Sequence, residues 1–288
     1  MTALTIQGRE ASIGVALMLM VAVIGAMDAI IVRSVSPSVH PFIIGFTRSL
    51  FGFLAFLPWI LSHPQILKSH YRFRHVLRAA LKLGSLIAFF AAYANSPLAD
   101  VTAIAFTTPI FVTVGAWVFL SELPRTIRVT AVVIGFAGVF VVLQPGQHSA
   151  VASGLWLALL GAFLAALIQL ILKPMSARDS TQTLVAWNLI VTVPLAAVPA
   201  YFVWQMPSAL EWVFLAVQGV MGALAMAMAT RAFALADASL ISPIDFLRLP
   251  LVAGLAYWVF GQVPDITTWI GGAMIFAATL LMARSARS

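Results

Sequence analysis

The chain has 288 residues, of which 62% are hydrophobic and only 9% are charged, and its formal net charge is +7. Soluble domains usually carry about 25% charged residues, so this chain has too little polar surface to enclose a water-soluble core. It contains no cysteine, which excludes disulfides, thiolate metal sites and cysteine nucleophiles.

Ten apolar segments run through the chain, each about as long as a transmembrane helix, which needs about 20 residues. In chain order they occupy roughly residues 12–32, 41–61, 76–96, 101–120, 127–143, 153–173, 182–203, 212–234, 238–260 and 267–284. None shows the alternating polarity of a membrane barrel strand. The first segment has full length and lacks a small-residue cleavage site, which favours a structural helix over a signal peptide. We therefore predict an all-α integral membrane protein with ten transmembrane helices.

The second half of the chain repeats the first. Gly14–Arg33 aligns without a gap with Gly154–Lys173 at an offset of 140 residues, and Pro109–Phe119 aligns with Pro250–Phe260 at an offset of 141. Internal repetition of this kind is typical of transporters in which two repeats form a substrate site between them. We expect a first five-helix repeat over residues 12–143 and a second over residues 153–284.

The basic residues indicate the orientation in the membrane. With the amino terminus in the cytoplasm, the external loops hold Arg33 alone. The cytoplasmic stretches then hold thirteen basic residues: Arg9, Lys68, Arg72, Arg74, Arg78, Lys82, Arg125, Arg128, Lys173, Arg178, Arg231, Arg284 and Arg287. This bias predicts a multi-pass protein of the bacterial inner membrane with both termini cytoplasmic, and it explains the net charge without a nucleic-acid partner. Because each repeat has an odd number of helices, we expect two inverted five-helix repeats.

Four charged residues fall well inside the predicted helices: Asp28, Arg48, Asp245 and Arg248. An unpaired charge near the bilayer centre costs about 2.5–3.5 kcal/mol on insertion scales, so these side chains must pair, face a watery cavity, or do both. Pairing alone is one interpretation, because Asp245 and Arg248 are one helical turn apart and Asp28 and Arg48 both lie toward the outer face. Substrate binding is the other, since intramembrane charges commonly mark transport pathways.

Arg248 is the leading candidate for substrate binding. It lies about ten residues into its predicted helix, about 15 Å along the axis and close to the midplane. Pro250 follows it, and Pro109 stands at the matching place in the first repeat, with Thr107 in the position of Arg248. Broken helices at matching places in two inverted repeats are typical of transporter binding sites. We therefore predict hinges at Pro109 and Pro250; kinks needed only for packing are the alternative.

Further polar and aromatic side chains at membrane depth complete the predicted substrate site. Asn188 is the repeat partner of Arg48, which favours a shared lining role, and Trp187 can stack on a planar substrate. The other candidates are Tyr93, Thr107, Thr108 and Gln169. Interhelical hydrogen bonds, or for tryptophan an interfacial position, explain each of them equally well. The histidines lie in loops or at helix ends, so no metal site is expected.

Three stretches resemble a known family: Arg-x-x-Phe at Arg48–Phe51, PLADVTAIAFTTPIFV at Pro97–Val112, and Glu122 just before Leu-Pro. Together with ten spans in two repeats, they resemble the drug/metabolite transporter (DMT) superfamily and its EamA family, from about residue 13 to 284. Asp28-Ala29 and Asp245–Pro250 are most similar to the branch that contains bacterial riboflavin and S-adenosylmethionine permeases.

The residues and the resemblance together predict a secondary transporter that moves a small organic metabolite by alternating access. A planar or zwitterionic metabolite such as riboflavin or S-adenosylmethionine is the preferred substrate, and an amino-acid or metabolite exporter of the same fold is the alternative. A non-transporting membrane scaffold is the alternative from another class, although it needs neither midplane charges nor broken helices. No enzyme and no cofactor are expected, because the spans carry no nucleophile–base pair. A proton is a candidate coupling ion, and monomer and homodimer are both open.

Overall fold

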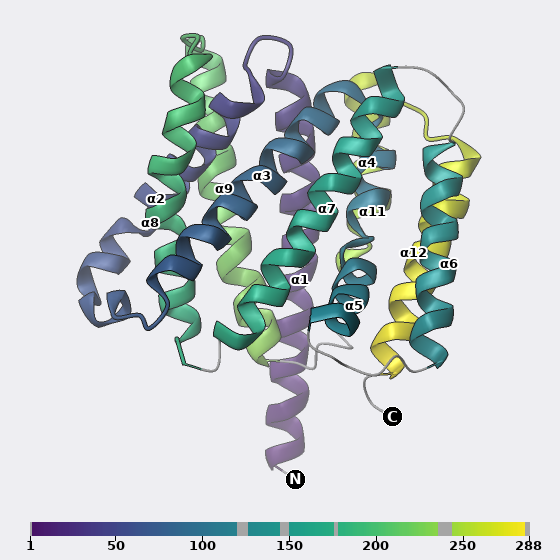
Figure 1. The fold of residues 1–288 in the computed structure, drawn as a ribbon, viewed down its shortest axis with the longest axis horizontal. Helices are drawn as coiled ribbons and strands as arrows, with labels where there is room; N and C mark the ends of the chain where they lie inside the picture. The colour runs from purple at the N-terminus through teal and green to yellow at the C-terminus, as the bar shows by residue number, and fades with distance from the viewer. Residues whose placement is uncertain (1, 120–125, 145–149, 176–177, 236–243, 286–288) are drawn as a thin grey trace.

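The computed structural model describes residues 2–119, 126–144, 150–175, 178–235 and 244–285, which are helical apart from short connections (Figure 1). The elements are α1 (Thr2–Val35), α2 (Pro41–Ser62), η1 (Pro64–Leu67), α3 (Arg72–Asn95), α4 (Leu98–Ala105), α5 (Thr108–Phe119), α6 (Thr126–Leu143), α7 (Ala150–Met175), α8 (Thr181–Phe202), α9 (Ala209–Leu235), α11 (Arg248–Phe260) and α12 (Ile266–Ser285). Glu122 and residues 238–243 of the ninth predicted segment lie outside the described residues.

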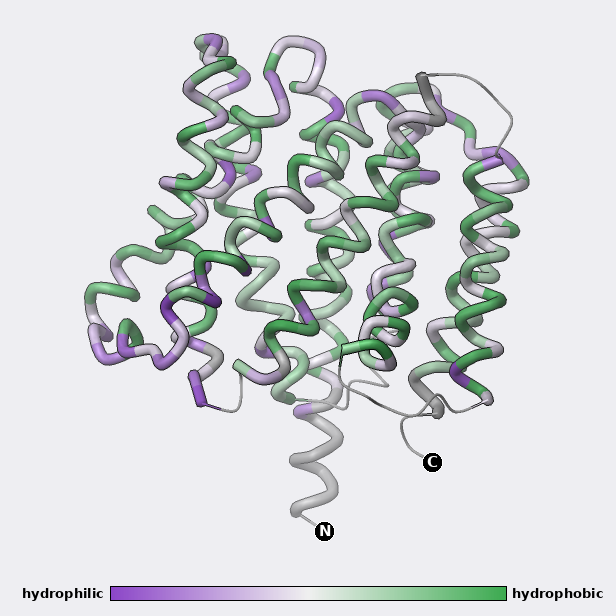
Figure 2. Tube along the Cα trace, in the orientation of Figure 1, coloured by the Kyte–Doolittle hydropathy of each residue, from purple (hydrophilic) through white to green (hydrophobic). Residues whose placement is uncertain are grey.

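Within the described residues, eight spans are long and apolar enough to cross a membrane, with the consecutive α4 and α5 counted as one span, Leu98–Phe119. The ninth and tenth predicted segments are shorter apolar helices, α11 and Ile266–Met282 of α12. Hydrophilic residues gather at the two ends of the molecule, most clearly in the connection between α2 and α3, whereas the middles of the helices are hydrophobic (Figure 2). Large apolar side chains such as Phe140 and Trp156 are exposed on the outer surface. The chain is therefore a multi-pass membrane protein.

The most extensive helix contacts join the first half of the chain to the second: α6 with α12, α3 with α7 and α1 with α9. These contacts are matched, because α1 and α3 are the first and third spans of one half, and α7 and α9 are those of the other. The contact of α2 with α9 is matched in the same way by that of α3 with α8. In Figure 1, α6 and α12 form a pair at the right, and α2, α8 and α9 lie at the left.

Two helices are interrupted at matching places. A turn at residues 106–107 separates α4 from α5, and a turn at residues 246–247 precedes α11. The rings of Phe106 and Phe246 from these two turns stack at 4.1 Å between centroids. Pro109 and Pro250 each lie in the first turn of the helix that follows, where a missing backbone N–H leaves no hydrogen bond unmade. The breaks lie where the prolines predicted them, while the hinge function remains a prediction.

At one end of the molecule, the connection after α2 meets the connection between α7 and α8 through the buried carboxylate of Asp179. This carboxylate accepts hydrogen bonds from Ser69 Oγ and from the backbone N–H of His70 at 3.1 Å, and it lies 3.1 Å from His75 Nε2. We call Ser69, His70, His75 and Asp179 the Asp179 latch. Burial raises the pKa of Asp179, but the hydrogen bonds from Ser69, His70 and His75 outweigh burial and lower it to about 2.

At the opposite end, the connection between α1 and α2 meets the start of α9 (Figure 1). The contact there is a hydrogen bond from Ser38 Oγ to the carboxylate of Glu211, on the exposed surface. Residues 38–40 and 178–180 are equivalent at the 140-residue offset, so the described parts of these two connections match. One junction is buried and the other is exposed.

Candidate functional site

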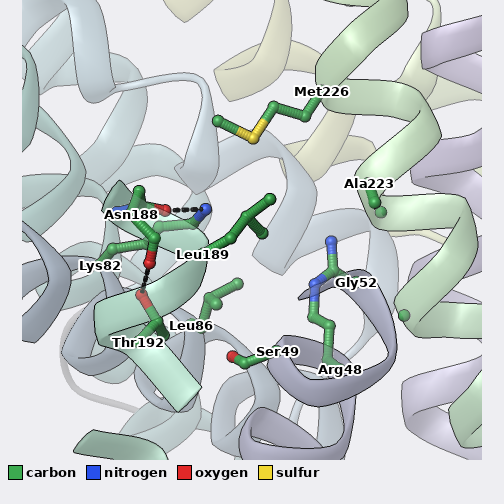
Figure 3. A pocket seen from close by; sticks show the side chains of 12 residues that line it. Arg48, Ser49, Gly52, Lys82, Leu86, Asn188, Leu189, Thr192, Ala223 and Met226 are labelled. Carbon is green, nitrogen blue, oxygen red and sulfur yellow. Dashed lines mark hydrogen bonds between the residues drawn. The ribbon is translucent and has the colours of Figure 1, made fainter. Parts of the chain in front are cut away.

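A cavity of about 330 Å³ lies where α2, α3, α8 and α9 meet, so each half of the chain contributes two helices. Its volume is at the lower end of the range for small-molecule sites, about 300–1,000 Å³. Figure 3 shows Lys82 and Asn188 joined on one side, with Arg48 and Met226 extending toward the cavity from α2 and α9. The lining residues are Arg48, Ser49, Gly52, Lys82, Leu86, Asn188, Leu189, Thr192, Gly219, Gly222, Ala223 and Met226.

The lining follows the internal repeat of the sequence. Ten of these twelve residues form five pairs that are 140 residues apart: Arg48 with Asn188, Ser49 with Leu189, Gly52 with Thr192, Lys82 with Gly222, and Leu86 with Met226. The first helices of the two halves align at the same offset. Equivalent positions of the two halves therefore face one shared cavity.

Two contacts across the cavity are equivalent to each other. Lys82 Nζ donates a hydrogen bond of 2.6 Å to Asn188 Oδ1. The guanidinium of Arg48 lies against Gly222, where an added Cβ would be only 2.8 Å from Nη2. The offset of 140 relates Arg48 to Asn188 and Lys82 to Gly222. The contact of Lys82 with Asn188 and the contact of Gly222 with Arg48 therefore join equivalent positions of the two halves. The first half supplies the cation each time, and none of the described lining residues carries a carboxylate.

The predicted pairing of Asp28 with Arg48 is present. Nη1 of Arg48 donates to Asp28 Oδ1 between α2 and α1, and the guanidinium lies 5.7 Å from the centroid of the Phe90 ring. The two paired side chains are only 20% and 17% exposed, which is compatible with a charge pair inside the membrane. Among the described contacts Lys82 has no carboxylate partner, so its charge is not neutralised in the same way.

Arg248 also has its predicted partner. Its Nη2 lies 2.6 and 2.9 Å from the two carboxylate oxygens of Asp245, one turn earlier. The side chain fits against Gly25 of α1, where a Cβ would be 2.7 Å from Nε, and lies 5.8 Å from the centroid of the Phe106 ring. Within the described part of the chain, Nε has no hydrogen-bond partner. Arg248 is not among the residues that line the cavity, so its binding role remains a prediction.

Tyr93 lies near both charge pairs. Its side chain is buried and lies close enough to Asp28, Arg48 and Arg248 to interact with their charges. It does not line the cavity. The structure thus places Tyr93 near the intramembrane charges, while its predicted contact with a substrate stays a prediction.

The hydroxyls of the two predicted threonines are engaged by the end of the preceding helix, α4. The hydroxyls of Thr107 and Thr108 donate to backbone carbonyl oxygens three residues earlier, at 2.7 and 2.9 Å. Thr108 is the first residue of α5, just as Arg248 is the first residue of α11. Counted from the helix start, Thr108 rather than Thr107 corresponds to Arg248.

Gln169 and Trp187 also lie apart from the cavity lining. Gln169 is exposed on α7. The Trp187 ring stacks on the ring of His75 at 5.2 Å, and its Nε1 donates to the carbonyl of Leu67. Trp187 therefore packs one ring face against the Asp179 latch, and its stacking on a substrate stays a prediction.

Two basic residues inside α3 were assigned to the cytoplasmic stretches by the sequence, which the structure corrects. Arg78 is almost fully buried and donates to the carbonyl of Leu184, while Lys82 lines the cavity. Both reach partners on α8, so they do not need the aqueous phase. The sequence held a signal for the position of Lys82 inside the membrane, because Lys82 lies within the predicted span 76–96. It also stands at the offset of 140 from Gly222.

Comparison with known proteins identifies the family. The profile of the EamA-like transporter family matches residues 12–144 and again residues 152–284. The chain is 30% identical over 239 residues to a riboflavin transporter from Rhizobium johnstonii, which covers 82% of this chain and 78% of the relative. It is 26% identical over 272 residues to an S-adenosylmethionine uptake transporter from Rickettsia bellii, covering 94% of this chain and 93% of the relative.

The fold has a counterpart among solved structures. A protein described only as a crystal structure superposes with a TM-score of 0.63 at 18% identity, over 98% of this chain and 99% of the other. This likeness supports the fold and carries no information on substrate. The double family match and the relatives show that the chain belongs to the EamA-like transporters of the DMT superfamily, in the branch that includes these riboflavin and S-adenosylmethionine transporters.

Proposed function

We propose that this protein is a secondary transporter that moves a small organic metabolite across the inner membrane by alternating access. Residues 12–143 and 153–284 are the two repeats of this transporter, with inverted topology and both termini cytoplasmic. One observation carries the proposal: five pairs of equivalent residues from the two halves line a single cavity. A shared cavity of this kind supports a binding site located between inverted repeats.

The matched packing of the halves supplies the physical basis for two states. If two inverted repeats differ slightly in conformation, exchanging these conformations gives a second state of similar energy that opens to the other side. The cavity stays between α2, α3, α8 and α9 in both states, because each half contributes the same positions to it. Pro109 and Pro250 are the proposed hinges, since each follows a turn that interrupts a helix.

The lining favours a planar metabolite with hydrogen-bonding edges, for which riboflavin is the best candidate. Arg48, Lys82 and Asn188 offer donors and an amide to polar edges, and Leu86 and Met226 offer apolar contacts to a ring. Tyr93 and the Asp245–Arg248 pair are not among the lining residues, and we propose that they support the site without contacting the substrate directly. A proton is the proposed coupling ion.

Counterflow in proteoliposomes tests the function. Vesicles that contain the purified protein and unlabelled riboflavin should accumulate labelled riboflavin saturably, and an imposed pH gradient should drive net uptake if protons are coupled. Asn188→Leu should raise KM at least tenfold, because Lys82 then loses its amide partner. Asn95→Leu is the matched control, since Asn95 is exposed at the end of α3 and its described side-chain hydrogen bond goes to Ala91 of its own helix. Saturable uptake of neither riboflavin nor S-adenosylmethionine, or normal uptake by Asn188→Leu, would contradict the proposal.

A further inference from the structure

We infer that the cavity selects its substrate by charge: Lys82 and Arg48 form a subsite for an anionic or electron-rich carbonyl group, and metabolites with net positive charge are excluded. This inference rests on the proposed transport function and specifies the substrate class of the same cavity. Its basis is the unequal way in which the two halves fill equivalent positions.

Lys82 is the first half of the subsite. It lies ten residues into α3, about 15 Å along the helix axis and so close to the middle of a bilayer core about 30 Å thick. An ammonium group has three hydrogen-bond donors, and Asn188 Oδ1 takes one of them. The others are available to a ligand in the cavity. A neutral amide does not neutralise the ammonium, so its positive charge is left for a ligand to balance.

Arg48 is the second half. A guanidinium has five hydrogen-bond donors. In the described part of the chain, one donor of Arg48, at Nη1, is engaged by the carboxylate of Asp28. The guanidinium extends to Gly222 of α9, and the absence of a side chain at that glycine makes the room for it. The planar fork is therefore held at the cavity wall, in a geometry that suits a carboxylate, a phosphate or an imide edge.

The surrounding charges reinforce the preference. Arg78 lies one turn before Lys82 on α3, and Asp28 is the carboxylate that pairs with Arg48 next to the cavity. The lining itself contains two cations and no acid. Because Arg48 is paired with Asp28, a cationic substrate would chiefly meet the unneutralised charge of Lys82, in a weakly screened site. Riboflavin, with an uncharged ring and a carbonyl-bearing edge, fits this field, whereas the sulfonium and ammonium groups of S-adenosylmethionine do not.

A cysteine in the cavity lining reports the local electrostatic potential without any substrate, through its reaction rates with charged reagents. The chain contains no cysteine, so Met226→Cys places a single thiol in the lining, and Met206→Cys places one on the exposed α8–α9 connection, where Met206 is 77% exposed. Each is treated with an anionic and a cationic methanethiosulfonate of similar size. The ratio of anionic to cationic reaction rates should be at least tenfold higher at position 226 than at 206.

Removal of the Lys82 charge should lower the ratio of anionic to cationic reaction rates at position 226. In the Met226→Cys background, Lys82→Met should lower it about tenfold, while Lys68→Met, which removes an exposed loop cation, should leave it unchanged. Equal ratios at positions 226 and 206, a preference for the cationic reagent, or reaction with neither reagent at 226 would overturn the inference. The comparison of positions 226 and 206 needs no change at Lys82, so it decides the question even if Lys82→Met fails to fold.

Transport assays then separate this inference from the proposed function. Riboflavin counterflow should not be inhibited by S-adenosylmethionine, and Lys82→Met should raise its KM by about ten- to a hundredfold, the value of a charge-assisted hydrogen bond. Saturable transport of S-adenosylmethionine by the unaltered protein would overturn the charge selection while supporting transport. Anion-selective labelling without riboflavin transport would support the subsite and overturn the choice of riboflavin as substrate.

Discussion

The two intramembrane arginines occupy similar settings with different outcomes. Each is paired with an aspartate and lies against a glycine from the other half of the chain, Gly222 for Arg48 and Gly25 for Arg248. The Asp28–Arg48 pair joins two helices beside the cavity, whereas Asp245 and Arg248 are one turn apart in a single segment. Only Arg48 lines the cavity. Depth in the membrane therefore identifies a special charge, but its neighbours decide whether that charge meets a ligand.

The largest expected effect is at Arg48. Arg48→Ala leaves Asp28 unpaired beside the cavity, and loss of one partner of a buried pair costs about 3–5 kcal/mol; the partial exposure here points to the lower end. We expect transport to fall at least a hundredfold, together with a lower melting temperature in detergent. Asp28→Asn with Arg48→Gln should recover the melting temperature but not transport. A double variant that transports normally would reduce this pair to a structural role.

The glycines give a finer test of the same comparison. A Cβ at Gly222 would press on the end of the Arg48 side chain at 2.8 Å, and one at Gly25 would press on Arg248 Nε at 2.7 Å. Overpacking costs about 1–3 kcal/mol. We expect Gly222→Ala to raise KM about tenfold with little change in stability, because the displaced group is the proposed ligand contact. Gly25→Ala should instead lower the melting temperature with KM unchanged.

Gly254→Ala is the matched control for both glycines, because an added Cβ there meets nothing within 4 Å. Its KM and melting temperature should stay at the values of the unaltered protein. If Gly25→Ala raises KM as much as Gly222→Ala does, the distinction between the two arginines is lost.

The smallest effect is expected from neutralising the second pair. Asp245→Asn with Arg248→Gln removes both charges, and replacement of a complete ion pair by neutral groups is often tolerated. We expect uptake per inserted protein to stay within about threefold of the unaltered chain. The result that would contradict this expectation is loss of uptake in the double variant together with loss of uptake in Arg248→Lys, while both proteins keep normal stability. Since lysine lacks the planar fork of arginine, that result would make Arg248 a substrate contact.

Much of this arrangement was accessible from the sequence. Hydropathy predicted the long helices, spacing predicted the Asp245–Arg248 pair, and the offset of 140 linked Asn188 to Arg48. Lys82 was missed because α3 begins in a basic stretch, so its cations resembled those of a cytoplasmic loop. The contact between His75 and Asp179 joins residues 104 positions apart, and neither residue carries a local signal for it. Tertiary packing creates that contact, which no periodicity could indicate.

The Asp179 latch has a consequence for the speed of the proposed cycle. If the cavity opens toward that end by parting these connections, a buried carboxylate separates from Ser69, His70 and His75, whereas the described hydrogen bond at the matching junction, from Ser38 to Glu211, is exposed. Breaking buried polar contacts costs more than breaking exposed ones. We therefore expect the two half-reactions of the proposed cycle to have unequal barriers, with the conformational step at the Asp179 end as the slower one.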